Sequence, residues 1–334
     1  MSVIAVAASP EVRELFFDAD AWAALRRLGE VRLPDAGDDV GDETVLAGLL
    51  ADADVVVTGW GCAPLTSAVL AAAPRLRLLA HTGASVKPFV TADSFARGVR
   101  VTQAGEAMAY AVGEQALALT LALLHGLHRF DHALRTGVDW ATAKAAPPRR
   151  ELRGATVGVV GASRTGRCYL GLVRALGARV LVADPYLSDA EAATLGVERA
   201  DLADLLGRSL VVSLHAPVLP ETVGMIGARE LALLPDGALL VNTARSALVD
   251  EAALLAALRT GRIDAALDVF DAEPLPVDHP LRRLPNVLLT PHEAAGTVGS
   301  RRRAADIVVA EVDRFLRGLP LRHEVRPADL DRTG

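Results

Sequence analysis

The stretch Thr156-Val157-Gly158-Val159-Val160-Gly161-Ala162-Ser163-Arg164-Thr165-Gly166 decides the fold. Its β-branched run predicts a strand over 156–160, followed by a glycine-rich turn and a helix that continues to about Gly177. Gly161 suits the tight turn, and Gly166 lets the helix pack closely on the sheet. The helix N-terminus offers unpaired N–H groups and a positive dipole end to a pyrophosphate. The segment therefore predicts a dinucleotide-binding turn.

Two further positions bear on the cofactor. Ser163 stands at the motif's middle glycine, so its side chain either holds the phosphate slightly further away or donates its hydroxyl to it. Asp184 ends the next predicted strand, 23 residues after Gly161, where a carboxylate binds the ribose 2′-hydroxyl. The turn alone is compatible with an ordinary loop between a strand and a helix. With Asp184 it favours NAD over NADP, because a carboxylate repels a 2′-phosphate.

Short β-branched runs alternate with alanine- and leucine-rich helical stretches along the chain. This alternation is typical of parallel sheets covered by helices, so the fold class is α/β. A helix is expected over 66–73, and a weakly ordered segment over 136–150, with Pro147 and Pro148, separates two series of strands. The C-terminal helix, about 300–317, fits either series. The predicted strands are 3–7, 54–58, 76–80 and 99–102 in the first series, and 156–160, 179–183, 209–214, 238–241, 265–268 and 287–290 in the second.

The composition excludes several classes of protein. The chain has 334 residues, which suits two domains, and its net charge of -6 argues against a nucleic-acid surface. Cys62 and Cys168 provide neither a disulfide framework nor metal-ligand spacing, which fits a reducing cytoplasm and predicts no metal. The N-terminus lacks the pattern of a signal peptide. The apolar run 107–124 contains Glu114 and Gln115, so we expect a buried helix there rather than a membrane span.

Three reactive side chains, Arg245, Glu273 and His292, follow the last three predicted strands. The carboxyl ends of parallel strands meet at one edge, so we expect all three beside the cofactor turn. Arginine can clamp a carboxylate and polarise a carbonyl, and histidine can exchange a hydroxyl proton near neutral pH. A carboxylate can orient that histidine and stabilise its charged form. The set predicts hydride transfer involving a 2-oxo or 2-hydroxy acid.

Each of these side chains also has a purely structural interpretation. Arg245 could pair with Asp250 on the surface, Glu273 could be a loop charge before Pro274, and backbone groups could satisfy His292. Their joint occurrence at matched strand ends, behind a nucleotide turn, favours the catalytic interpretation.

These segments resemble the D-isomer-specific 2-hydroxyacid dehydrogenase family. The resemblance implies an NAD-dependent dehydrogenase or 2-oxoacid reductase in which Arg245 binds and polarises the substrate, His292 is the acid–base group and Glu273 is its partner. The matching segments are 151–161, His215-Ala216-Pro217 with Pro220-Glu221-Thr222, Asn242-Thr243-Ala244-Arg245, Val249-Asp250-Glu251, Asp268-Val269-Phe270 with Glu273-Pro274, and Pro291-His292. The expected cofactor contacts are Gly161, Ser163, Arg164, Thr165, Gly166, Asp184, His215, Ala216, Pro217, Thr222, Thr243, Ala244, Arg245, Asp268, His292, Ala294 and Ala295.

The resemblance also implies the domain organisation. A Rossmann NAD-binding domain is expected over 104–299, and a discontinuous flavodoxin-like substrate domain over 1–103 and 300–334, both doubly wound. The active site would lie between the domains and close by hinge motion. The long helix beginning near Glu106 resembles the family's dimerisation helix, so a homodimer is expected, with no nucleic-acid or membrane partner.

The first domain departs from the family pattern where substrate is expected. In Thr82-Gly83-Ala84-Ser85-Val86-Lys87 the first glycine of the usual Gly-x-Gly turn is retained, whereas Ser85 and Lys87 are substitutions. Met108 stands where the family commonly has asparagine, and Gln115 where it often has histidine. Trp60 either makes the pocket more apolar or only anchors its loop. The expected substrate contacts are Trp60, Gly83, Ala84, Ser85, Met108, Arg245 and His292, which leave the identity of the acid open.

The same fold is compatible with other functions. One is an NAD-sensing regulator, like the family's corepressor relatives, although no segment resembles a peptide-recruiting or DNA-binding appendage. Another is a biosynthetic enzyme with an unusual acid. A phosphoglycerate dehydrogenase with a regulatory extension is disfavoured, because the sequence stops soon after Arg317.

Overall fold

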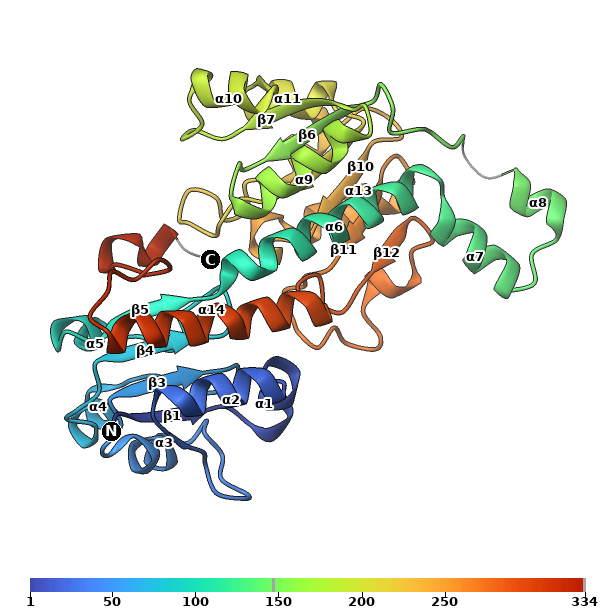
Figure 1. The fold of residues 1–334 in the computed structure, drawn as a ribbon. Coiled ribbons are helices and arrows are strands. Elements are labelled where there is room, and N and C mark those ends of the chain that lie inside the picture. The colour runs from blue at the N-terminus through green and yellow to red at the C-terminus, as the bar shows by residue number, and fades with distance from the viewer. Residues whose placement is uncertain (146–147, 333–334) are drawn as a thin grey trace. The chain divides into compact units, whose positions relative to one another are not determined.

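The computed structural model describes residues 1–145 and 148–332 (Figure 1). The chain divides into two compact units. Unit 1 is Met1–Met108 with Gly296–Gly334, and unit 2 is Ala109–Ala295. The first division falls within helix α6 (Gly105–Leu124), and both divisions lie a few residues from the boundaries 103/104 and 299/300 expected from the sequence. Pro147, in the segment predicted to be weakly ordered, lies outside the described residues.

Unit 1 contains a parallel five-stranded sheet in the order β2-β1-β3-β4-β5, which is the flavodoxin-like order. Helix α14, at the C-terminal end, packs against α1, α2, β4 and β5 of this unit. The strands are β1 (Val3–Ala7), β2 (Glu30–Arg32), β3 (Val55–Thr58), β4 (Leu78–His81) and β5 (Arg100–Gln103). The helices are α1 (Pro10–Phe16), α2 (Ala19–Leu28), α3 (Glu43–Leu50), α4 (Ser67–Ala72), α5 (Ala92–Ala96) and α14 (Val298–Leu316).

Unit 2 contains a parallel seven-stranded sheet in the order β12-β11-β10-β9-β6-β7-β8, the Rossmann order extended by one strand. The predicted α/β fold with two parallel sheets is therefore confirmed. The strands are β6 (Thr156–Val160), β7 (Arg179–Ala183), β8 (Glu198–Arg199), β9 (Val211–Leu214), β10 (Leu239–Asn242), β11 (Asp264–Leu267) and β12 (Val287–Leu289). Besides most of α6, the helices are α7 (Leu127–Arg135), α8 (Trp140–Lys144), α9 (Arg164–Ala175), α10 (Asp189–Leu195), α11 (Leu202–Arg208), α12 (Ala228–Leu233) and α13 (Glu251–Arg259).

The structure corrects the prediction in three respects. Strands β2 and β8 were not expected, because these short edge strands carry charged residues rather than an apolar pattern. Helix α8 lies in the segment predicted to be weakly ordered. Its N-terminus is fixed by Asp139, whose carboxylate accepts hydrogen bonds from Ala141 N (3.1 Å) and Thr142 N (3.0 Å). Most other strand limits differ from the prediction by one or two residues, for example at Asp268, which follows β11 rather than ending it.

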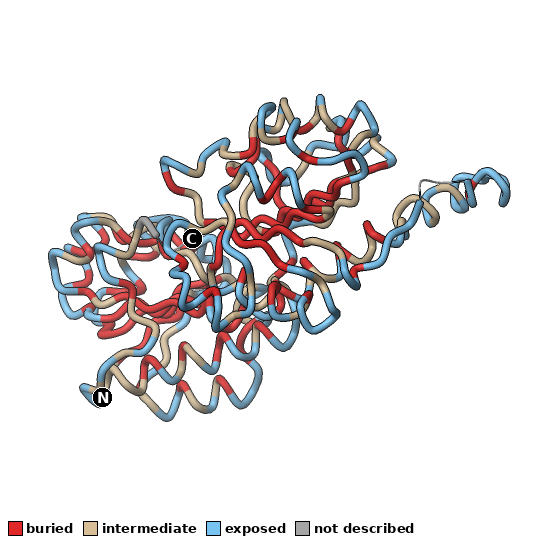
Figure 2. The backbone as a smooth tube through the Cα atoms, turned by 90° about the horizontal axis from the view of Figure 1, so that it is seen from above, coloured by how far each residue is buried: buried red, intermediate tan, exposed pale blue. Residues whose placement is uncertain are grey.

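Helix caps and buried strands account for the local structure. Ser188 and Glu191 form the expected capping box of α10, and Asp250 caps α13, which Gly261 follows with a φ of 72°. Buried segments run through the centre of each unit (Figure 2). Because the central strands of both sheets are buried on both faces, side chains that could bind a ligand are expected in the loops at the strand ends.

Helix α6 is the one helix among the described residues that is long and apolar enough to cross a membrane by length and composition. A core helix passes the same test. Ala116, Leu119 and Leu123 belong to the same buried cluster as Val157 and Tyr169, so α6 contributes to the core of unit 2.

Candidate active site

The glycine-rich turn after β6 has the backbone that a pyrophosphate requires. Gly161 has a φ of 93°, and a Cβ atom at this position would lie 2.6 Å from Ala216 N. A Cβ at Gly166 would lie 2.2 Å from Gly161 O. Ser163 caps α9, since its Oγ accepts a hydrogen bond from Gly166 N at 3.3 Å. The Ser163 hydroxyl, which stands at the position of the motif's middle glycine, is therefore hydrogen-bonded to the first turn of the helix itself.

Asp184 lies directly after β7 and is held against this turn. Its Oδ2 accepts a hydrogen bond from Ala162 N at 2.6 Å, and its Oδ1 accepts one from Tyr186 N at 2.8 Å. These bonds fix a negative charge beside the turn, at the place where a ribose would be bound.

Two buried polar atoms just after the carboxyl ends of β9 and β10 have no hydrogen-bond partner among the described residues: His215 Nδ1 and Thr243 Oγ1. The other ring nitrogen of His215 lies 2.8 Å from Ser213 Oγ. Burial lowers the pKa of His215 to about 3, so the ring is neutral at physiological pH. Buried groups left without partners are rare, and together with the glycine turn they suit a bound dinucleotide.

The remaining expected cofactor contacts lie in the same loops. Thr165 Oγ1 lies 3.0 Å from Ser163 Oγ, and Arg164 is exposed at the start of α9. Thr222 organises its own loop, since its Oγ1 accepts from Leu219 N and donates to Pro217 O, both at 2.7 Å. Ala216, Ala244, Ala294 and Ala295 follow the carboxyl ends of β9, β10 and β12.

Glu273 and His292 form a close pair. The distance from His292 Nδ1 to Glu273 Oε2 is 2.6 Å, and Glu273 Oε1 accepts a hydrogen bond from Phe270 N at 3.0 Å. Partial burial acts to raise the pKa of Glu273, but these hydrogen bonds and the charges of His292 and Arg245 outweigh it and lower the pKa. Glu273 is thus a carboxylate that orients the imidazole and leaves its Nε2 available.

The loop that carries His292 is fixed by the buried Asp268. Its carboxylate accepts hydrogen bonds from Thr290 Oγ1 (2.5 Å), Glu293 N (3.1 Å) and Ala294 N (3.0 Å). His292 lies between these anchors with a φ of 54°, a left-handed conformation that is uncommon for residues other than glycine. Non-glycine residues in such conformations cluster at functional sites, where the surrounding structure holds them in place.

Arg245 leaves β10 through a turn organised by Asn242. The Asn242 side chain accepts from Ala244 N at 3.0 Å and donates to Arg245 O at 2.9 Å. Burial lowers the pKa of Arg245, and the Glu273 carboxylate opposes this effect. Asp250, which could have paired with Arg245 on the surface, instead caps α13. The structure therefore brings Arg245 within electrostatic range of the Glu273–His292 pair.

The expected substrate residues of unit 1 also lie at strand ends. Trp60, 43% exposed, packs edge-to-face on Phe16 at a centroid distance of 5.2 Å, so it both anchors its loop and presents apolar surface. A Cβ at Gly83 would lie 2.5 Å from His81 Nε2 and 3.3 Å from Trp60 Nε1, so a larger residue there would have to displace the buried His81 ring. Ala84 and Ser85 are half-buried and follow β4, whereas Met108 is buried in α6.

The sequence interpretation missed the positioning roles of Asn242 and Thr290. An asparagine two residues before a turn N–H is a recognisable signal, because its side chain can bond the backbone locally. Thr290 offered no comparable signal, since its partner Asp268 is 22 residues away in sequence. In residues 1–145 and 148–332, no group of three or more His, Cys, Asp or Glu side chains could hold a metal ion.

Comparison with known proteins identifies the second unit. Residues 117–294 match the family model described as the D-isomer specific 2-hydroxyacid dehydrogenase, NAD binding domain. Together with the turn, Asp184 and the two unpartnered buried groups, this match establishes NAD as the cofactor of unit 2.

Relatives extend the similarity beyond this unit. D-3-phosphoglycerate dehydrogenase of Mycobacterium leprae is 38% identical over 297 residues, which are 89% of this chain and 54% of that protein. Glyoxylate reductase of Aeropyrum pernix is 36% identical over 255 residues, 75% of this chain and 76% of that protein. The apo crystal structure of Rhodotorula graminis D-mandelate dehydrogenase has a TM-score of 0.86 and 26% identity, covering 97% of this chain and 98% of that one.

The chain spans about half the length of the phosphoglycerate dehydrogenases that it matches. The family model covers more than half of the chain, and the glyoxylate reductase is matched over three quarters of both sequences. The chain belongs to the D-isomer specific 2-hydroxyacid dehydrogenase family.

Proposed function

We propose that the protein is an NAD-dependent D-2-hydroxyacid dehydrogenase, or 2-oxoacid reductase. The observation that carries this proposal is the 2.6 Å pair between His292 Nδ1 and Glu273 Oε2, at the carboxyl edge of an NAD-binding sheet. The relatives named above are two dehydrogenases and a reductase. They give no support to the alternative of an NAD-sensing regulator, which we do not propose.

Each of the three side chains has a distinct role in this proposal. Arg245 binds the substrate carboxylate and polarises the carbonyl oxygen, because its guanidinium keeps its charge even when buried. His292 donates a proton from Nε2 to that oxygen during reduction, and accepts one during oxidation. Glu273 keeps the imidazole oriented and stabilises its charged form. NAD(H), when bound, supplies or accepts the hydride.

The finer assignments rest on the family resemblance and on local structure. We assign substrate contacts to Trp60, Gly83, Ala84, Ser85 and Met108 of unit 1.

We also propose a cytoplasmic homodimer. Helices α7 and α8 project from the rest of unit 2 (Figure 1) and expose Leu127, Leu134 and Trp140, which are 57%, 48% and 71% accessible. Exposed apolar side chains on a projecting segment support contact with a second copy.

A substrate panel tests the activity. NADH oxidation is followed by absorbance with glyoxylate, hydroxypyruvate, phenylpyruvate and branched 2-oxo acids, and at least one should be reduced. Tight NADH binding without turnover of any 2-oxo acid would contradict the proposal.

The acid–base assignment needs its own variant. His292→Gln should lower kcat by about 10²- to 10⁴-fold, the contribution of positioned acid–base catalysis, and leave the NADH dissociation constant within a few-fold of the wild type. His279→Gln is a matched control, because His279 also pairs with a carboxylate of unit 2 (Nε2 to Glu251 Oε1, 3.3 Å). Full activity of His292→Gln would remove His292 from the acid–base role.

A further inference from the structure

A cavity of about 450 Å³ lies in unit 2, away from the proposed active site. Its lining includes Leu239 and Asp264, the first residues of β10 and β11. Arg245 and Glu273, by contrast, follow the carboxyl ends of these two strands. Four residues of extended chain span roughly 13 Å, so the cavity and the catalytic side chains lie at opposite edges of the sheet.

Four arginines line this cavity, although the chain as a whole has a net charge of -6. Arg129 is neutralised by Asp264, through bonds of 3.0 Å from Nε and 2.6 Å from Nη2. Arg262 donates to the backbone carbonyl oxygens of Leu231 and Leu234, and lies 3.6 Å from a carboxylate oxygen of the exposed Asp236.

The other two guanidinium groups have no carboxylate partner among the described residues. Arg149 lies over the ring of Phe130, with Cζ 5.7 Å from the centroid, which leaves the N–H edges of the group available. Arg150 is anchored through its backbone N–H to Leu124 O at 2.9 Å, and its Nη2 would lie 3.2 Å from a Cβ at Gly237. The two aspartates of the lining cannot balance four arginines, so the cavity carries an excess of positive charge.

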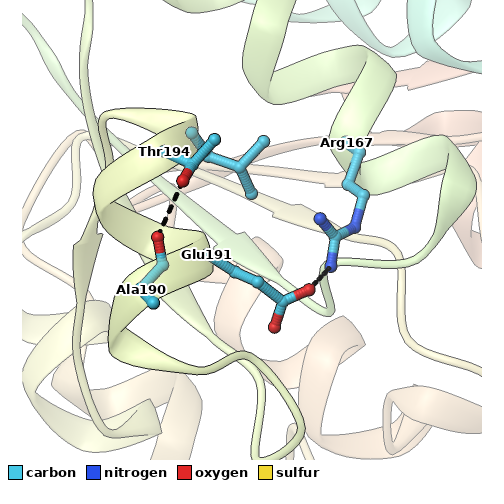
Figure 3. Close-up of a pocket in the computed structure, with 5 residues that line it drawn as sticks. Arg167, Ala190, Glu191 and Thr194 are labelled. Atoms are coloured by element: carbon cyan, nitrogen blue, oxygen red, sulfur yellow. Dashed lines mark hydrogen bonds and ion pairs between the residues drawn. The ribbon is translucent and has the colours of Figure 1, made fainter.

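The start of α7 adds to the positive charge around the cavity. Gly126 lines the cavity and precedes α7, and it has no side chain to cap the nine-residue helix. The uncapped first turn presents the positive end of the helix dipole. A second pocket of unit 2 differs from this cavity because its arginine is paired with a carboxylate. It has a volume of about 210 Å³, and there Arg167 Nη2 lies 3.2 Å from Glu191 Oε1, so its cation is already paired (Figure 3).

We propose that this arginine-lined cavity binds a small multivalent anion bearing a phosphate or diphosphate group, at a site separate from the NAD and substrate positions. The volume lies within the usual range for small-molecule sites. Guanidinium groups bind phosphate oxygens through two parallel hydrogen bonds, so Arg149 and Arg150 supply the recognition. Arg129 and Arg262, held by their own partners, form the rigid walls.

The test uses the full chain saturated with NADH, so that the turn from Gly161 to Gly166 cannot capture the probe. Inorganic pyrophosphate is titrated calorimetrically at ionic strength matched with sodium chloride. Arg149→Gln and Arg150→Gln should each weaken pyrophosphate binding about tenfold or more, because each loses a charge-assisted hydrogen bond. Arg27→Gln removes the same charge from an exposed position of unit 1 and should leave binding unchanged.

Thermal unfolding and NADH affinity verify that each variant is folded. Pyrophosphate binding of equal strength in the wild type and in both cavity variants would overturn the proposal. So would the absence of binding above the chloride control, as would result if a second copy of the chain filled the cavity. Turnover of 2-oxo acids is measured separately, so failure of the proposed activity does not affect this result.

Discussion

Replacing Glu273 with glutamine tests the central pair of the proposed site. Glu273→Gln keeps the size of the side chain and one oxygen acceptor for Phe270 N, but it removes the charge that faces His292 Nδ1 at 2.6 Å. Proton donation during reduction requires the charged imidazolium, which the variant no longer stabilises. We therefore expect a lower kcat for reduction and an unchanged affinity for NADH.

The exposure of the pair sets the size of the effect. Two unit charges 4 Å apart attract by about 1 kcal/mol in water and about 4 kcal/mol at an effective dielectric constant of 20. The side chains of His292 and Glu273 are 45% and 36% exposed, so solvent screening places the pair near the lower value. A loss of about 1–2 kcal/mol corresponds to a rate about 5- to 30-fold lower.

The assay is the rate of NADH oxidation with saturating 2-oxo acid across about pH 5 to 8. The pKa of Glu273 is lowered, so the wild-type carboxylate stays ionised over this range, whereas in the variant protons from solution replace the missing stabilisation as the pH falls. The deficit should therefore narrow toward pH 5. Asp271→Asn removes an exposed carboxylate of the same loop and serves as the control. Variant activity within twofold of the wild type, or a deficit independent of pH, would refute the reasoning.

Three further predictions concern the cofactor turn and the buried histidine of unit 1. Asp184→Asn should reduce the preference for NADH over NADPH about tenfold or more, measured as a ratio of dissociation constants; an unchanged ratio would remove Asp184 from the ribose site. Gly161→Ala places a Cβ 2.6 Å from Ala216 N and should cost about 1–3 kcal/mol of stability and weaken NADH binding, whereas Gly171→Ala, in open space within α9, should be neutral or stabilising by thermal unfolding. Burial lowers the pKa of His81 from 6.5 to about 4. Below pH 6.5 His81 is therefore protonated in the unfolded chain, whereas in the folded chain it stays neutral down to about pH 4. The free energy of unfolding falls by up to about 3 kcal/mol as the pH drops through that window. Chemical unfolding of His81→Asn should show less of this loss, and an unaltered pH dependence would contradict the assignment.

The sequence predicted the sheet of unit 2 well because its strands obey local rules. Apolar β-branched runs such as those of β6 and β7 are buried on both faces, and both strands occupy the predicted residues. Strand β8, Glu198–Arg199, is exposed and pairs only with β7 at the edge of the sheet. Its pairing is determined by the neighbouring strand rather than by its own residues, so no local pattern could reveal it.

Residue types and positions at strand ends were also sufficient to nominate Arg245, Glu273 and His292. The residues that hold these side chains in place were harder to predict, because their hydrogen bonds join segments that are far apart in the sequence. Thr290 and the loop N–H groups around His292 bond to a single carboxylate at Asp268, in the preceding loop. The sequence interpretation gave Asp268 only a cofactor contact. Such long-range bonds become visible only when β11 and β12 lie side by side.

The buried position of Asp268 explains why this arrangement suits catalysis. A fully buried carboxylate is costly unless it is satisfied by hydrogen bonds, and Asp268 receives three from the segment Thr290 to Ala294. Displacing that segment would leave the carboxylate unsatisfied, so the anchors on either side of His292 resist movement. The histidine thereby keeps its left-handed backbone and its distance to Glu273 while its ring remains partly exposed. The buried Asp268 carboxylate holds the loop in place, and the proposed proton exchange falls to the partly exposed pair of His292 and Glu273.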